Sequence, residues 1–127
     1  MSMSFDNPRP SCCRPLIESS PRDLAAVLAR VGRRLLVLYG TVLPEEVRKT
    51  LAEGGDDLRL FEMSGSEPSP LDESVEVGAS ICRHERIDVL LAVGGDSVKE
   101  FAVRISEAFR HKDLTGRGVD IVFVRIA

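Results

Sequence analysis

One segment, residues 88–102 with the sequence DVLLAVGGDSVKEFA, constrains the fold more than any other part of this chain. An apolar run ends in two glycines, and a helical pattern of apolar residues begins directly after them. A buried parallel strand that turns through glycine into a helix brings backbone N–H groups and the positive end of the helix dipole together, an arrangement that suits a phosphate. Asp96 departs from this pattern, because its carboxylate would repel a nearby phosphate.

Length and composition indicate one globular domain. The chain has 127 residues, enough for a single core, with 43% apolar and 29% charged residues. The net charge of -3 and the lack of a basic patch argue against nucleic acid or an anionic membrane as a partner. No apolar run approaches the roughly 18 residues of a membrane span, and the N-terminus lacks the apolar core of a signal peptide, so we expect a cytoplasmic protein.

Cysteine and histidine are sparse. Cys12 and Cys13 are adjacent and Cys82 is distant, which is neither a disulfide framework nor a paired zinc spacing, so we expect reduced thiols. The only histidines in the sequence are His84 and His111. His84 lies in the charged stretch RHER and is expected at a solvated helix end. Neither the cysteines nor the histidines therefore predict a metal site.

The chain divides near Ser20 into an irregular arm and a regular body. Residues 1–19 contain three prolines and show neither helical nor strand periodicity, so we expect no regular structure there. In residues 20–127, strand and helix patterns alternate. Strands are predicted at 35–39, 58–62, 89–93 and 121–124, and helices at about 21–31, 44–53, 70–84 and 98–109. Such alternation predicts a single α/β domain of three layers with a mostly parallel sheet.

Ligands of such sheets bind beyond the carboxyl ends of the strands. If the strand at 35–39 lies between those at 58–62 and 89–93, the loops after Tyr39 and Val93 face each other across a crevice. Residues of both loops are therefore candidates for binding.

The same residues also admit purely structural roles. Ser97 and Glu100 fit a capping box, S-x-x-E, at the start of the last predicted helix. Asp96 could face the positive end of that helix's dipole, and the two glycines could serve only the turn. Tyr39 could simply cover the end of the core.

Three stretches, in order, resemble the iron-dependent or group III alcohol dehydrogenases, especially their butanol dehydrogenase-like branch. LLVLYG at 35–40 is similar to that branch's first strand, SEPSP at 66–70 to its linker, and LLAVGGDS at 90–97 to its AVGGGS cofactor loop. The resemblance spans roughly residues 33–108. It implies a Rossmann-like NAD(P)-binding domain of a metal-containing oxidoreductase that interconverts primary alcohols and aldehydes. Gly94, Gly95 and Ser97 match the pyrophosphate-binding loop, and the candidate cofactor-binding residues are Gly94, Gly95, Asp96, Ser97, Tyr39 and Gly40.

Departures from the family pattern argue against activity of this chain alone. Asp96 replaces the third glycine of the loop, Glu100 an aspartate and Val103 a lysine, and the glycine-rich continuation after Gly40 is missing. Two histidines cannot supply the three that hold the family's iron or zinc, so we expect no metal site and no catalytic residue. We expect NAD(P) binding weakened by about 1 to 2 kcal/mol through Asp96. The sequence is thus interpreted as a truncated or degenerate NAD(P)-binding domain.

Two other classes of function stay open. One is a non-catalytic α/β interaction module, which uses an exposed sheet or helix face to bind a partner or a second copy of itself. A half-domain that has lost its companion exposes apolar surface, which favours a homo-oligomer or a partner chain that supplies the missing domain. The other is a nucleotide or sugar kinase, since those phosphate loops also begin with strand-GGD, although they usually have glycine where Ser97 stands. Nucleotide binding that needs Mg²⁺ would indicate the kinase, and binding of NAD(P) without Mg²⁺ the dehydrogenase domain.

Overall fold

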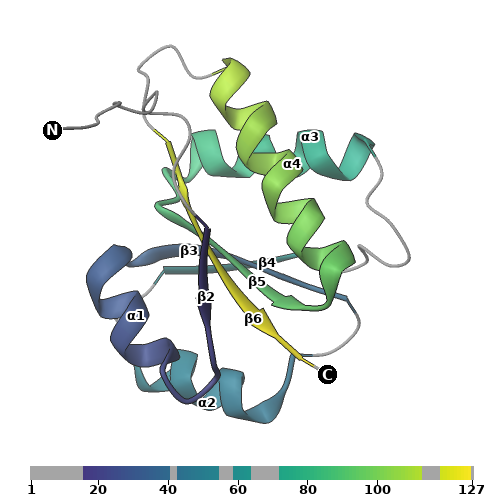
Figure 1. Cartoon of the computed structure of the whole chain (residues 1–127). Coiled ribbons are helices and arrows are strands. Elements are labelled where there is room, and N and C mark those ends of the chain that lie inside the picture. Colours follow the sequence, from purple (N-terminus) through teal and green to yellow (C-terminus); the bar gives the residue numbers. More distant parts are fainter. Residues whose placement is uncertain (1–15, 41–42, 55–58, 64–71, 113–117, 127) are drawn as a thin grey trace, which may run out of the picture.

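The computed structural model describes residues 16–40, 43–54, 59–63, 72–112 and 118–126. Within these residues, helices and strands alternate along the chain in three layers (Figure 1). The elements are β2 (Leu16–Ser19), α1 (Leu24–Val31), β3 (Arg34–Tyr39), α2 (Glu45–Glu53), β4 (Arg59–Met63), α3 (Asp72–His84), β5 (Val89–Gly94), α4 (Asp96–Lys112) and β6 (Asp120–Arg125). The strands pair in parallel in the order β2-β6-β5-β3-β4. The predicted Rossmann-like α/β domain with a parallel sheet is confirmed.

The prediction of an irregular arm over residues 1–19 is wrong for its last four residues. Leu16–Ser19 forms β2, an edge strand whose register with β6 runs from Leu16↔Ile121 to Ser19↔Val124. Four residues are too few to show a strand period, and the backbone partner that orders them lies at the other end of the chain. The rest of the predicted arm, including Cys12 and Cys13, lies outside the described residues.

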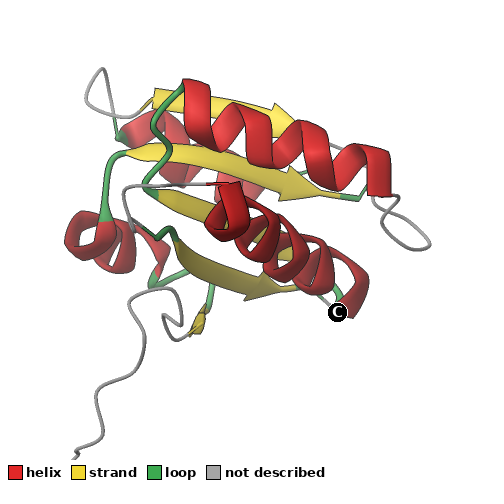
Figure 2. Ribbon diagram, turned by 90° about the horizontal axis from the view of Figure 1, so that it is seen from above, coloured by secondary structure: helices red, strands yellow, loops and turns green. Residues whose placement is uncertain are grey.

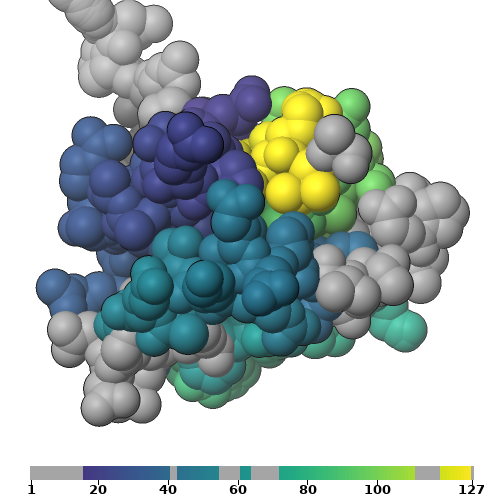
Figure 3. Space-filling view, turned by 90° about the horizontal axis from the view of Figure 1, so that it is seen from below, coloured from purple at the N-terminus to yellow at the C-terminus, as the bar shows by residue number. Residues whose placement is uncertain are grey.

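The apolar core lies on both faces of the sheet, because side chains along each strand alternate between the faces. On one face α3 and α4 cover Leu36, Leu90 and Phe123. On the other face α1 and α2 cover Leu35 and Leu91. Figure 2 looks down on the side of α3 and α4, whereas Figure 3 shows the opposite side, where α1 and α2 lie next to each other.

The helix faces predicted from periodicity are confirmed. The buried residues of α4 are Val98, Phe101, Ala102, Ile105 and Phe109, at the predicted positions. In α3 the buried residues are Val75, Gly78, Ala79 and Cys82. Three- and four-residue spacing gives each helix one apolar side, and its burial against the sheet stabilises the fold.

The described part of the chain has no helix long and apolar enough to cross a membrane. Within that part, the only large apolar side chain that is strongly exposed is that of Val77, at 49%. The cytoplasmic location and the homo-oligomer or partner chain expected from the sequence stay predictions.

Candidate functional site

The loops after β3 and β5 lie at the point where the chain changes its direction of travel across the sheet. β3 lies between β4 and β5, which is the arrangement that a shared crevice requires, and Tyr39 pairs with Val93 at the carboxyl ends of the two strands. After β3 the chain enters α2 on one face, and after β5 it enters α4 on the other. In open α/β sheets, such a switch point is where ligands bind. The fold therefore brings Tyr39 and Gly40 to the same sheet edge as the glycine loop.

Gly94 is required by the turn itself. Its φ of 147° lies in a region that L-residues with side chains rarely adopt, and a Cβ there would stand 3.0 Å from Cγ2 of Val98. Gly95 differs, since a Cβ on this residue would meet no atom of the described, non-adjacent residues within 4 Å. The backbone conformation of the turn explains Gly94, whereas Gly95 leaves the backbone of the loop accessible.

α4 begins two residues earlier than predicted. The carbonyl of Gly95 accepts the N–H of Lys99 at 3.2 Å, and Asp96 is the first helical residue. The N-cap position therefore falls on Gly95, and the prediction of Ser97 as the N-cap of a capping box with Glu100 is wrong. The spacing S-x-x-E occurs inside the first turn here, because the glycine pair lets the helix start at once.

Asp96 forms an ion pair that was not predicted from the sequence. Its Oδ1 lies 2.9 Å from Nη2 of Arg125 at the end of β6, and the two side chains are 82% and 49% exposed, respectively. Asp96 also lies in the first turn of α4, where the helix dipole favours a carboxylate, as the sequence suggested. Strand alternation puts Arg125 on the same face as Phe123, toward α4, but it does not identify Asp96 as the partner.

Tyr39 has a structural role at the end of the sheet. Its ring packs against the core under α1 and α2, and its hydroxyl donates a hydrogen bond to Oε1 of Glu62 at 3.1 Å. These contacts agree with the expectation that Tyr39 covers the end of the core. Gly40 follows directly and is half-buried.

The described residues contain no group of three or more His, Cys, Asp or Glu side chains that could hold a metal ion. His84 is exposed at the end of α3, as predicted, and its Nδ1 lies 2.9 Å from the carbonyl oxygen of Ser80. Cys82 is buried in the core.

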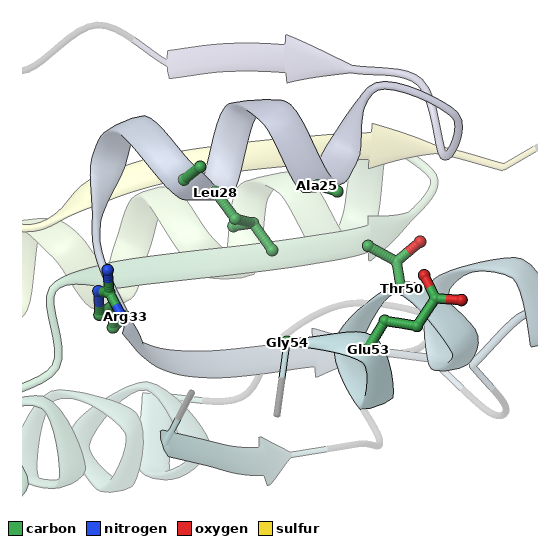
Figure 4. Close-up of a pocket in the computed structure, with 7 residues that line it drawn as sticks. Ala25, Leu28, Arg33, Thr50, Glu53 and Gly54 are labelled. Atoms are coloured by element: carbon green, nitrogen blue, oxygen red, sulfur yellow. The ribbon is translucent and has the colours of Figure 1, made fainter. Parts of the chain in front are cut away.

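A groove of about 230 Å³ lies between α1 and α2, on the face away from α4 (Figure 4). Leu28 and two alanines of α1 form its apolar side, and Thr50 and Glu53 come from α2. Arg33, directly before β3, also lines the groove. None of the candidate cofactor-binding residues lines it.

Solved structures similar to this fold include two proteins named as dehydrogenases. NADH-dependent butanol dehydrogenase A from Thermotoga maritima matches 94% of this chain and 33% of its own length, with a TM-score of 0.64 and 22% identity. An iron-containing alcohol dehydrogenase from the same organism matches 89% of this chain and 36% of its own, with a TM-score of 0.69 and 17% identity.

Curated relatives agree with this likeness. "Probable NADH-dependent butanol dehydrogenase 2" of Bacillus subtilis is 36% identical over 88 residues, which are 65% of this chain and 22% of the relative. NADH-dependent butanol dehydrogenase A of Clostridium acetobutylicum is 32% identical over 74 residues, which are 55% of this chain and 19% of the relative. The chain thus spans about a fifth of the length of these relatives. Because the model of the iron-containing alcohol dehydrogenase family also matches residues 18–123, the chain belongs to that family.

Proposed function

We propose that the loop Gly94–Ser97 binds the pyrophosphate of NAD(P)(H), and that this region is the dinucleotide-binding part of an enzyme that interconverts primary alcohols and aldehydes. The observation that carries the proposal is the open backbone at Gly95, at the switch point of the sheet and at the start of α4. A Cβ on Gly95 would have no atom of the described, non-adjacent residues within 4 Å, so a phosphate could approach the N–H groups closely. The relatives named as NADH-dependent support the same ligand.

The role proposed for the described residues is binding and orientation. The N–H groups of the loop and the positive end of α4 would hold the negative charge of the pyrophosphate, with the hydroxyl of Ser97 as a further donor. The described residues do not fit the iron of the family name, because they form no cluster of metal ligands. We therefore assign no metal-dependent step to them.

We also propose that this loop binds more weakly than a loop with three small residues. Asp96 stands at the position of the third glycine, and its carboxylate is exposed beside the loop. A negative charge near a phosphate lowers affinity, by an amount that depends on the solvent and on nearby cations.

Calorimetric titration of the full chain with NADH and NADPH, with and without Mg²⁺, tests the proposal. We expect saturable binding that needs no Mg²⁺ and that becomes several-fold tighter in Asp96→Gly. Glu107→Gln is the matched control, because it removes an exposed carboxylate of α4 far from the loop. Absence of binding in both the wild type and Asp96→Gly would refute the proposal and favour the interaction module. Binding of ATP that depends on Mg²⁺ would favour the kinase alternative.

A further inference from the structure

We propose that Arg125 and Asp96 act as one charge-compensating unit, in which Arg125 offsets part of the repulsion from the Asp96 carboxylate and so limits the loss of affinity of the glycine loop for a pyrophosphate. The inference rests on the proposed function, and it gives Arg125 the role of a positioning residue that acts through Asp96. It accounts for how a loop with a carboxylate in place of its third glycine can still accept an anion.

The backbone fixes Arg125 beside the loop. In the sheet register Arg125 pairs with Gly94, and the N–H of Ile126 donates to the carbonyl of Gly94 at 2.9 Å. Since side chains alternate along β6, Arg125 projects toward the same face as Phe123, the face that α4 covers. Its guanidinium therefore meets the first turn of α4, where Asp96 lies.

A buried aromatic ring holds the guanidinium in this place. Cζ of Arg125 lies 5.1 Å from the centroid of the Phe123 ring, and Nζ of Lys99 lies 5.5 Å from the same centroid. Phe123 is fully buried, so its ring cannot follow the movements of an exposed side chain. Cation–π attraction adds to the ion pair and restricts the positions of Arg125.

The charges around the loop are balanced only while Arg125 is present. In the first turns of α4, Asp96 and Glu100 contribute two carboxylates, and Lys99 contributes one cation. Arg125 supplies the second cation from β6. Without it this end of α4 would carry a net negative charge, and a single uncompensated carboxylate near a phosphate weakens binding by about tenfold at intermediate dielectric.

A double-mutant cycle on the full chain tests the inference, with NADH titrated calorimetrically. The variants are Arg125→Met, Asp96→Asn and the double variant. Arg125→Lys keeps the charge, and Arg30→Met is the matched control, because Arg30 is an exposed arginine of α1 away from the loop. Urea unfolding of each variant checks that stability is retained, as expected for two exposed side chains.

We expect Arg125→Met to weaken NADH binding about tenfold and the double variant to return to within about threefold of the wild type. Arg125→Lys and Arg30→Met should stay close to the wild type. Binding by Arg125→Met at the wild-type affinity would overturn the inference and leave the proposed function intact. A double variant as weak as Arg125→Met would also overturn it, because Arg125 would then act on the ligand directly.

Two further outcomes separate the inference from the function on which it rests. Binding by Asp96→Asn but not by the wild type would show that Arg125 fails to compensate the carboxylate, and would overturn the inference alone. Absence of binding in every variant, Asp96→Asn included, would refute the proposed function and the inference together.

Discussion

Val98 lies so close to Gly94 that a Cβ added to the glycine would stand 3.0 Å from Cγ2 of Val98. The φ of 147° at Gly94 excludes most side chains in any case. At Gly95, one residue later, neither constraint is found among the described residues. The two glycines therefore have different roles. Gly94 is needed for the backbone conformation of the turn, and Gly95 leaves space beside the loop for a ligand.

We predict that alanine substitution affects stability at Gly94 and ligand binding at Gly95. Gly94→Ala should lower the free energy of unfolding by about 1 to 3 kcal/mol, because the residue would be strained and would press on Val98. Gly95→Ala should change it by less than about 0.5 kcal/mol but should weaken NADH binding. Urea unfolding and calorimetric titration measure the two effects. Equal loss of stability in both variants would contradict the assignment of a structural role to Gly94 alone.

α3 and α4 approach each other closely at Gly78. A Cβ on Gly78 would lie 2.5 Å from Cδ1 and 2.9 Å from Cγ1 of Ile105, a fully buried side chain. We predict that Gly78→Val destabilises the protein by about 1 to 3 kcal/mol through overpacking, and Ile105→Ala by about 2 to 5 kcal/mol through a cavity.

The double variant Gly78→Val/Ile105→Ala should be less destabilised than the sum of the single variants, because the added valine fills space that the isoleucine leaves. Equilibrium unfolding of the four proteins gives the coupling free energy. Simple additivity of the two effects would show that the side chains do not share this space.

α3 ends in a Schellman motif whose left-handed residue is an arginine. The N–H of Ile87 donates to the carbonyl of Cys82 at 3.1 Å, and Arg86 has a φ of 53°. Glycine adopts this conformation without the penalty that a Cβ brings. We predict that Arg86→Gly raises the free energy of unfolding by about 0.5 to 1 kcal/mol.

Arg86→Ala is the control for that prediction, because it removes the charge but keeps the Cβ. Its stability should stay within about 0.5 kcal/mol of the wild type. A gain in Arg86→Ala as large as in Arg86→Gly would assign the effect to the lost charge and not to the backbone.

Arg34 connects the start of β3 to the end of α3. Its Nε donates to the carbonyl of Glu85 at 2.8 Å, and its own carbonyl accepts the N–H of Asp88 at 2.8 Å. Arg34→Met keeps the backbone bond but leaves the Glu85 carbonyl without this donor. We predict a loss of about 1 to 2 kcal/mol in thermal or urea unfolding, against no measurable change in the exposed Arg30→Met.

Helices and strands whose signals are local could be predicted from the amino-acid sequence. The apolar run Leu35–Tyr39 and the period of Val98, Phe101 and Ile105 identified a buried strand and the inner side of a helix, because strand and helix periods are read within one segment. The alternation of such segments was enough to predict a parallel three-layer domain. The glycine pair likewise marked the turn at the carboxyl end of β5.

Features that join distant parts of the chain became apparent only in the folded structure. β2 is a strand because β6 supplies its hydrogen-bond partners, and Asp96 forms an ion pair because Arg125 comes to lie 2.9 Å from it. The start of α4 at Asp96 could not be predicted from the sequence pattern either, because the pattern also fitted a helix with Ser97 as its N-cap. Pairing between strands and contacts between side chains far apart in sequence depend on where the folded backbone runs, which no local period encodes.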